Sequence, residues 1–380
     1  MGVTTGDGAT DLAQLSRFLL RSEAIASSQI EGIAPSARQV ALAELAQDED
    51  LSGFSAQAEL VARNMTMVAQ ATTRLASADR VDAGSIVALH DALLRDDPQH
   101  HGLRTVQNWI GGSYLHPLDA DFVPPDPEQV PSLMADLVQY LNGAAHSPII
   151  QAALVHAQFE TIHPFTDGNG RVGRALIHTV LTRRGLTSAA ILPISLVLAT
   201  FSDEYVRALS QYRYDAPASS PQAASGRRSW LEEFATTVLR ATEQAETLRA
   251  DVAMIRQDWT DQLEAHRSQH GRRRLRSDSA TARILADLPG TPVLTAATVR
   301  RIHGVSPMAA NHALTELEEA GILESHAAGR GRRAYLATAV LDLITLTERR
   351  LASTRFDTRA SDPNRPVPAR PNRPAPSTAS

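Results

Sequence analysis

The sequence predicts an all-α protein with one short β-hairpin and a second, smaller domain near its C-terminal end. Alanine and leucine are abundant, and aromatic residues make up only 4% of the chain. Apolar residues recur at helical spacing from the start, as at Leu12, Leu15 and Leu19. The length of 380 residues exceeds the roughly 250–300 residues at which a single core stops growing, so two domains are expected.

Helices are expected over residues 11–75, 84–95, 128–142 and 148–162, where apolar side chains keep the helical period. A further helix, "NGRVGRALIHTVLTRRG", should end near Gly185, because glycine commonly terminates helices. The stretch "LRTVQNWIGGSYLHPLDADFVPPDPEQV" carries paired glycines and clustered prolines. It is therefore expected to form a short β-hairpin or an ordered loop.

The second half begins with residues 215–227, whose composition is that of a flexible surface loop. A long helix with Trp230, Phe234 and Leu239 follows and leads to the basic segment "GRRRLR", a domain boundary. From about Ser361 the chain is rich in Pro, Arg and Ala, and disorder is expected. The predicted parts are an N-terminal helical region at 1–80, a core with trailing helices at 81–270, a small domain at 278–350 and a disordered tail at 356–380.

The composition excludes several kinds of chemistry. The chain has no cysteine, which excludes disulfides, thiolate nucleophiles and cysteine-based zinc sites. It also has no lysine, so a Walker-type P-loop and a Schiff-base mechanism are excluded. Any phosphate must therefore be held by arginine side chains and backbone amides.

The charge and the N-terminal segment indicate a soluble protein. A net charge of −5 does not favour a nucleic-acid or membrane surface. No apolar run approaches the ~20 residues that cross a bilayer. The N-terminal "MGVTTGDGATDL" lacks the basic and then apolar layout of a secretory signal. We expect a cytoplasmic protein without a membrane partner.

The stretch "HPFTDGNGRVGR" at 163–174 concentrates polar chemistry after an apolar helix. Pro164 disfavours helical geometry at the residue before it, so the helix should end with the imidazole of His163 at its mouth. Gly168 and Gly170 let backbone N–H groups approach a ligand, and the next helix adds the positive end of its dipole. Arg171 and Arg174 enlarge this anion site because they lie on one helical face.

Two further residue types complete a nucleotide site. Asp167 stands at the edge of the loop and is suited to hold Mg²⁺ that bridges phosphate oxygens. His163, with an ordinary pKa near 6.5, is suited to accept a proton from a hydroxyl at neutral pH. The sequence therefore predicts a nucleotide-binding site beside a general base.

Other interpretations of the same residues fit less well. "DGNGRV" resembles the start of an EF-hand loop, but Arg171 stands where a calcium ligand should be. His156, Glu160 and His163 share one helical face, yet the chain has no second Glu-x-x-His for a di-iron site. We expect His156 and Glu160 to be internal hydrogen-bonding partners. A glycine-rich capping turn with solvated arginines does not account for the whole combination.

The stretch resembles the signature of Fic-domain proteins, His-Pro-Phe-x-Asp-Gly-Asn-Gly-Arg-x-x-Arg, with every specified position filled. The segments "FETI" and "EYVRAL" also resemble the family, and the resemblance spans about residues 20–245. It implies an all-α core that transfers AMP from ATP, with Mg²⁺, to a Tyr, Ser or Thr hydroxyl of a target protein. The target is unknown, and self-modification is one expected activity.

The resemblance also implies residue roles. His163 is the base and Asp167 binds Mg²⁺. The phosphates are held by the remaining signature residues: Gly168, Asn169, Gly170, Arg171, Gly173 and, for the γ-phosphate, Arg174. Tyr205 is a candidate for the base pocket, and "RTVQNWIGGS" is the flap on which a target docks as an added strand. Gly170 favours AMP transfer, while UMP and GMP stay open.

The stretch "SSQIEG" places Ser27 and Glu31 four residues apart, followed by Gly32 as a helix terminator. An exposed helix end is the simple interpretation. The resemblance instead implies the inhibitory motif of Fic proteins, Ser/Thr-x-x-x-Glu-Gly/Asn. A Glu31 carboxylate paired with Arg174 would occupy the guanidinium that holds the γ-phosphate, so Glu31 is expected to act as an off switch.

Residues 293–337 resemble a winged helix-turn-helix, with two helices about a short turn and then a hairpin. Ser306 before Pro307 is a good helix start. Phosphate contacts are available from Arg300, Arg301, Arg330, Arg332 and Arg333, and base contacts from Asn311 and His312. Glu316, Glu318 and Glu319 lie farther along the same helix and make a poor groove surface. DNA binding is therefore possible but less favoured than target recruitment or formation of a homodimer.

Two functions from different classes remain. The first is a self-inhibited protein adenylyltransferase, which the base and the complete anion site favour. The second is a transcriptional regulator in which a Fic core senses nucleotide.

Overall fold

The computed structural model describes residues 7–49, 51–112, 116–187, 191–329 and 331–354. The N-terminal part contains α1 (Asp7–Ile30), α2 (Ala37–Ala46), α3 (Ala56–Gln70), the π-helix η1 (Ala71–Leu75), α4 (Ala83–Leu93), α5 (Val130–Asn142), α6 (Pro148–Ile162) and α7 (Asn169–Arg183). The C-terminal part contains α8 (Ile194–Thr200), α9 (Ser202–Tyr212), α10 (Pro221–Gln269), α11 (Ala280–Asp287), β1 (Val293–Leu294), α12 (Ala296–His303), α13 (Pro307–Glu319), β2 (Glu324–Ala327), β3 (Arg333–Leu336) and α14 (Thr338–Thr354). The predicted helical fold class is confirmed.

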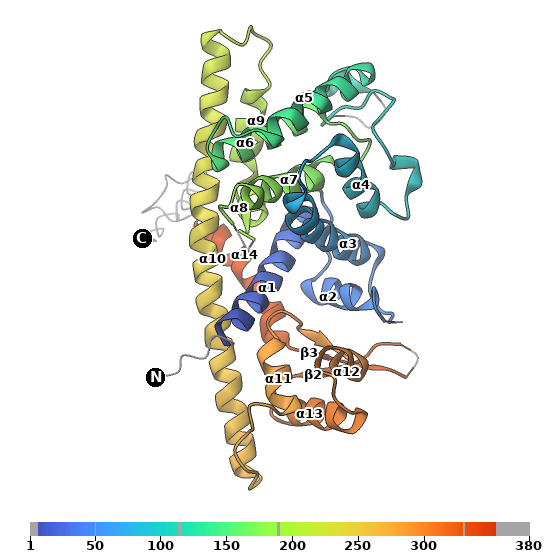
Figure 1. The fold of residues 1–380 in the computed structure, drawn as a ribbon, viewed down its shortest axis with the longest axis vertical. Helices are drawn as coiled ribbons and strands as arrows, with labels where there is room; N and C mark the ends of the chain where they lie inside the picture. Colours follow the sequence, from blue (N-terminus) through green and yellow to red (C-terminus); the bar gives the residue numbers. More distant parts are fainter. Residues whose placement is uncertain (1–6, 50, 113–115, 188–190, 330, 355–380) are drawn as a thin grey trace, which may run out of the picture.

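The helix starts follow from side-chain capping. A Ser, Thr or Asp side chain accepts a backbone N–H in the first turn of α2, α3, α4, α10, α11, α12 and α13. Such a cap contributes about 0.5–2 kcal/mol to helix stability. The long α10 runs along the longest axis of the molecule, and the labelled helices and strands lie to one side of it in Figure 1.

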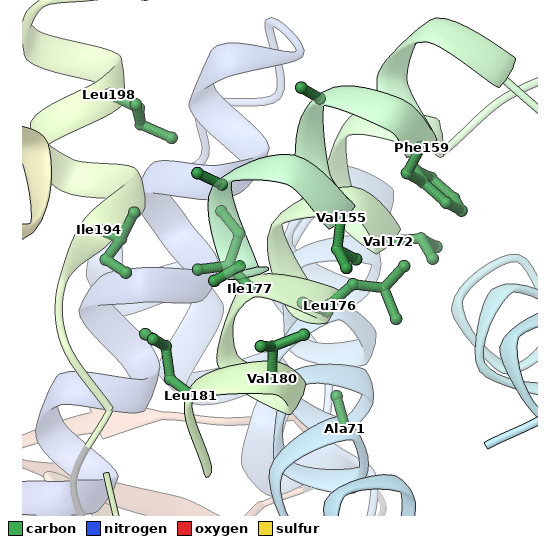
Figure 2. Close-up of a cluster of buried hydrophobic side chains, with 14 of the residues drawn as sticks. Ala71, Val155, Phe159, Val172, Leu176, Ile177, Val180, Leu181, Ile194 and Leu198 are labelled. Atoms are coloured by element: carbon green, nitrogen blue, oxygen red, sulfur yellow. The ribbon is translucent and has the colours of Figure 1, made fainter. Parts of the chain in front are cut away.

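The first core surrounds the pair α6 and α7. Figure 2 shows Val155 and Phe159 of α6 with Leu176, Val180 and other apolar side chains of α7, all within a buried cluster. At Gly173 the side chains of α6 lie close to α7, because a Cβ there would overlap Glu160 Oε1 and lie 3.1 Å from Phe159 Cδ1. The two helices that flank the signature loop are therefore held together tightly.

Between α4 and α5, where a short β-hairpin or an ordered loop was expected, the described residues contain one antiparallel bridge. Ile110 pairs with Phe122, with the Ile110 N–H donating to the Phe122 carbonyl at 2.9 Å. Short 3₁₀ turns occur before, within and after this segment, at Pro98–His100, Pro117–Asp119 and Pro127–Gln129. We refer to residues 102–126 as the flap; residues 113–115 lie outside the described residues.

The C-terminal unit packs α11, α12 and α13 against a three-stranded antiparallel sheet of order β1-β3-β2. Leu336 of β3 is paired on one side with Val293 and on the other with Glu324. α14 follows the last strand directly.

Helix α1 lies between this unit and the first core. One apolar cluster contains Phe18, Leu19 and Ile25 of α1 together with Ile284, Leu314 and Leu336 of the C-terminal unit. On the opposite side, Glu23 accepts a hydrogen bond from His178 Nε2 of α7 at 2.8 Å. The sequence boundary at 271–276 falls between α10 and α11, yet the apolar core continues across it to α1 and α2.

One predicted loop is wrong in part. Residues 215–227 were expected to be flexible, but α10 begins at Pro221, where the Ser220 side chain accepts the Ala223 N–H. Proline in the first turn and the alanines that follow favour a helix. Gly226 lies within this helix. It lets α10 pack closely on α9, because a Cβ there would overlap the Gln211 carbonyl. The composition suggested a loop, whereas capping and packing specify a helix.

Glu316 differs from Glu318 and Glu319, with which the sequence analysis grouped it on α13. Its side chain is 2% exposed. Thr281 Oγ1 donates to Glu316 Oε2 at 2.8 Å, and Arg267 and Arg272 pair with Oε1. The carboxylate therefore joins the end of α10 to α11 and α13, and buried charges of this kind need such partners.

Among the described residues, no helix is both long enough and apolar enough to cross a membrane. The tail predicted to be disordered, 356–380, lies outside the described residues, as does Arg330.

Candidate active site

His163 ends α6 immediately before the signature loop. It is the one non-glycine residue of the described ranges with a positive φ, at 49°. Such a conformation costs about 1–3 kcal/mol and is found mostly at functional sites. The Arg104 Nε–H donates to the His163 carbonyl at 2.9 Å, and the His163 N–H donates to the Phe159 carbonyl at 2.9 Å. The backbone is therefore fixed on both sides while the side chain stays 18% exposed.

The loop between α6 and α7 is closed on itself. The Asn169 side chain accepts the Phe165 N–H at 2.9 Å and donates to the Phe165 carbonyl at 2.8 Å. His90 of α4 stacks on the Phe165 ring at 3.8 Å and makes a 3.0 Å hydrogen bond to the Asp167 carbonyl. Gly168 adopts the left-handed conformation, with φ 78°, that starts α7. The sequence predicted Asn169 and Gly168 but missed His90, which no local motif marks.

Arg171 lies in the first turn of α7 with its side chain 1% exposed. Its Nη2 lies 3.3 Å from Asp167 Oδ2, while Nε and Nη1 have no hydrogen-bond partner within the described part of the chain. Buried donors without partners each cost about 1–3 kcal/mol, more when charged. Two such donors at a helix N-terminus indicate a site for an anion.

The Arg174 guanidinium is hydrogen-bonded to two residues of α1. Its Nη2–H donates to Glu31 Oε1 at 2.8 Å and to the Ser27 carbonyl at 2.7 Å, and its Nε–H donates to Ser27 Oγ at 2.9 Å. The guanidinium is 2% exposed and Glu31 is 31% exposed. A Cβ on Gly170 would overlap Glu31 Oε1. The carboxylate therefore lies over the start of α7, at the position expected for a phosphate.

A buried polar layer lies behind the loop. His156 Nε2 is 3.0 Å from the Tyr205 hydroxyl, and both rings pack near Trp230. Tyr205 is 5% exposed, so it contributes to the interior of the site rather than to an open pocket wall. Glu160 Oε1 and His156 Nδ1 have no partner among the described residues, and both would contact a Cβ placed on Gly173.

The electrostatics of this layer favour neutral side chains. Burial raises the pKa of Glu160 to about 7, while Arg174 opposes the rise. Burial, with Arg174 nearby, lowers the pKa of His156 to about 3. Burial and the nearby Arg213 guanidinium lower the pKa of His163 to about 4. At neutral pH the His163 imidazole is therefore unprotonated and able to accept a proton.

Arg104 connects the flap to the end of α6. Besides the His163 carbonyl, it donates to the carbonyls of Val106, at 3.2 Å, and Pro125, and it is 3% exposed. Sequence reasoning missed Arg104, because its partners lie up to 59 positions away.

The metal prediction can be compared with the donors present. Across the described residues, no three His, Asp or Glu side chains cluster so as to hold a metal ion by themselves. Asp167, 49% exposed at the loop edge, offers a single carboxylate. A Mg²⁺ ion held by one carboxylate and by substrate phosphates fits this donor set.

Comparisons with known proteins find a family model that covers the signature loop. Residues 80–181 match the model of the Fic/DOC family. The protein adenylyltransferase fic-1 of Caenorhabditis briggsae is 33% identical over 138 residues, 35% of this chain and 25% of that protein. A probable protein adenylyltransferase of Aquifex aeolicus is 32% identical over 120 residues, 31% of this chain and 35% of that protein. The matches thus span about a quarter to a third of the length of these curated relatives.

The fold is also found in a solved structure. A Fic domain containing signaling protein from Bacteroides thetaiotaomicron superposes with a TM-score of 0.51 at 20% identity, over 63% of this chain and 90% of that one. At this identity the superposition shows a shared fold. Residues 80–181 therefore form a domain that is similar to the Fic/DOC family.

Proposed function

We propose that the protein is a self-inhibited adenylyltransferase that moves AMP from ATP to a hydroxyl side chain of a target protein. The observation that carries the proposal is the juxtaposition at the start of α7. Unpartnered donors of Arg171 lie in the loop-helix unit that begins with His163, whose imidazole is unprotonated at neutral pH. The adenylyltransferase names of the curated relatives support the same activity.

The proposed chemistry is an in-line displacement at the α-phosphate. His163 accepts the proton of the target hydroxyl as its oxygen attacks, and the bond to the bridging oxygen breaks to release pyrophosphate. The backbone of Gly168 to Gly170 and the Arg171 guanidinium hold the α- and β-phosphates. Asp167 would hold Mg²⁺ with the phosphates, and the ion would supply positive charge to them.

Self-inhibition is proposed from the contacts of Arg174. The group assigned to the γ-phosphate is bound by Glu31 and Ser27, and Glu31 covers Gly170. A nucleotide that enters must either displace the carboxylate or place its γ-phosphate elsewhere, which would misalign the α-phosphate. A charge-assisted hydrogen bond of about 1.5–3 kcal/mol makes this competition substantial.

The test is direct. Purified wild-type protein, Glu31→Gly and Glu31→Gly/His163→Ala are incubated separately with labelled ATP, UTP, GTP and CTP, and the label on protein is measured. We expect label from ATP, strongest in Glu31→Gly and absent from the double variant. Label from UTP or GTP instead of ATP would mean that the transferred group is UMP or GMP. Absence of transfer from any nucleotide, with binding retained, would favour the sensor function.

For the C-terminal unit we propose a winged helix that serves mainly in protein contacts. The order α11-β1-α12-α13-β2-β3 and the β1-β3-β2 sheet support a winged helix. Asn311 and His312 are exposed, as a DNA reader requires. However, Arg301 pairs with Asp48 at 3.1 Å, and Glu49 accepts a hydrogen bond from Thr295 at the start of α12.

These acidic residues belong to the segment after α2, so they place negative charge beside the helices that would approach a phosphate backbone. DNA binding therefore stays the less favoured proposal, and a nucleotide-sensing regulator is the alternative function. Formation of a homodimer, self-modification and a cytoplasmic location also stay proposals.

A further inference from the structure

Arg213, the residue that follows α9, joins three parts of the candidate active site. Its Nη2–H donates to the Glu160 carbonyl near the end of α6 at 3.0 Å. Its guanidinium carbon lies 4.1 Å from the centre of the Phe122 ring in the flap. Phe122 is the residue that bridges to Ile110, so Arg213 touches the paired part of the flap itself.

These contacts are those of a positioning group. The hydrogen bond satisfies a carbonyl in the last turn of α6, where a cation is also favoured by the helix dipole. The stacking on Phe122 belongs to a class of interaction worth about 0.5–2 kcal/mol. The Nε of Arg213 is buried and has no hydrogen-bond partner among the described residues. The contacts with Glu160 and Phe122 therefore do not use all of its donors.

We propose that Arg213 is a positioning residue that holds the flap at Phe122 against the end of α6, so that a target hydroxyl held by the flap meets His163. This role rests on the proposed transfer function. The flap is otherwise connected to α6 through Arg104, whose donors go to backbone carbonyls. Arg213 adds a side-chain contact on the other arm of the bridge.

The same guanidinium acts on the charge of His163. Four ionisable groups face the imidazole. Arg213 after α9 and Arg104 in the flap disfavour its protonation, and Glu31 of α1 favours it, while Glu160 of α6 lies with Oε2 3.9 Å from Nδ1. Burial and Arg213 are the two largest causes that lower the pKa of His163. Loss of the Arg213 charge should therefore raise the pKa of His163, an effect that a merely structural contact would not produce.

The chain offers a matched control. Arg240 of α10 places its guanidinium carbon over the Phe201 ring at the same 4.1 Å. Arg240→Met thus removes an equivalent cation–π pair from a residue to which we assign no role in the reaction. Arg213→Met keeps most of the volume without charge, and Arg213→Lys keeps the charge without the planar stacking.

The experiment uses the full chain in the Glu31→Gly background. The pKa of His163 is measured by NMR titration of labelled histidines, assigned with His163→Ala. We expect a higher pKa in Arg213→Met, a value close to that of the parent in Arg213→Lys, and no change in Arg240→Met. Self-labelling at saturating ATP should fall by about tenfold or more in Arg213→Met, with ATP affinity within about twofold of the parent.

A folded Arg213→Met protein with the parent's His163 pKa and the parent's self-labelling rate would overturn the proposal. If Arg213→Met does not fold, Arg213→Lys provides the test. Loss of the stacking on Phe122 alone should still lower self-labelling and leave ATP affinity unchanged, and an unchanged self-labelling rate would overturn the proposal. If the parent does not transfer AMP at all, the proposed function fails. In that case the titration still tests whether the Arg213 charge acts on His163, because an unchanged His163 pKa in Arg213→Met overturns that part of the proposal without any activity measurement.

Discussion

Arg174 and Glu31 are separated by 143 positions in the chain and are joined by a 2.8 Å ion pair at the start of α7. Ser27, one helical turn before Glu31, binds the same guanidinium through both its hydroxyl and its carbonyl. The residue proposed to hold the terminal phosphate of a nucleotide is thus bound by two residues of α1.

Glu31→Gly should raise AMP transfer by at least about tenfold, since a charge-assisted hydrogen bond of about 1.5–3 kcal/mol no longer competes for Arg174. The measurement is the initial rate of self-labelling with labelled ATP. Glu59→Gly, another glutamate-to-glycine change in an N-terminal helix, serves as the control and should leave the rate unchanged. Equal rates for Glu31→Gly and the wild-type protein would mean that Glu31 is an ordinary residue at a helix end.

Arg174→Ala should impair transfer rather than activate it. The change removes the anchor of the carboxylate and also the group assigned to the γ-phosphate. The double variant Glu31→Gly/Arg174→Ala is compared with Glu31→Gly in the same labelling assay. We expect the double variant to stay well below Glu31→Gly, and full activity in it would remove Arg174 from the nucleotide site.

The pH dependence should follow the lowered pKa of His163, about 4 against an ordinary 6.5. A lowered pKa keeps the base unprotonated as the pH falls, so transfer by Glu31→Gly should stay level from about pH 8 to 6 and decline only toward pH 4. Removal of Glu31 moves this decline to lower pH, because the Glu31 charge favours protonation of His163. The same shift makes the folded state lose stability as the pH falls from 6.5 to 4. An acid limb centred near pH 6.5 would contradict this assignment.

Gly173→Ala should destabilise the protein by about 1–3 kcal/mol, because the new Cβ overlaps Glu160 and forces α6 from α7. Thermal unfolding followed by circular dichroism measures the effect. Gly84→Ala in α4 is the control, since its Cβ would meet only Asp82 Oδ1 at 3.4 Å. A Tm for Gly173→Ala at or above that of the wild-type protein would show that the two helices are not closely packed there.

The two apolar cores should unfold together. Trp230 lies in the cluster around α6 and α7, and Trp259 lies in the cluster shared by α1, α10 and the C-terminal unit. In a Trp109→Phe background, which removes the third tryptophan of the chain, fluorescence of Trp230→Phe and of Trp259→Phe should report coincident thermal transitions. Two separated transitions would instead support an independent C-terminal domain, as the sequence boundary at 271–276 suggested.

The sequence predicted the parts of the candidate site whose motifs are local. The signature at 163–174 and the Ser27 to Glu31 spacing each fit within a few turns of chain, and their resemblance to Fic motifs distinguished them from ordinary helix ends. His90, Arg104 and Arg213 act through contacts that span 53 to 77 positions. No periodicity marks such contacts, because an isolated histidine or arginine has the same pattern whether it is solvated or buried.

The differences in the fold have similar causes. The helical periods were long and regular, so α6 was predicted at its observed bounds, 148–162. The start of α10 was missed because serine, proline and alanine are shared by loops and by well-capped helix starts. The sequence analysis considered Glu316 only by its position along its own helix. Its burial depends on Arg267 and Arg272, which come from another part of the chain.

The position of α1 between two cores limits how the proposed inhibition by Glu31 can be relieved. Withdrawal of the whole helix would expose Phe18, Leu19 and Ile25, at about 1.5–3 kcal/mol for each side chain, and would be very rarely populated. A swing of the Glu31 side chain alone breaks one charge-assisted hydrogen bond of about 1.5–3 kcal/mol, which leaves roughly one molecule in ten to one in two hundred open at any moment. The uninduced protein should therefore have a small, constant basal activity, and an activator needs only to capture molecules that are already open.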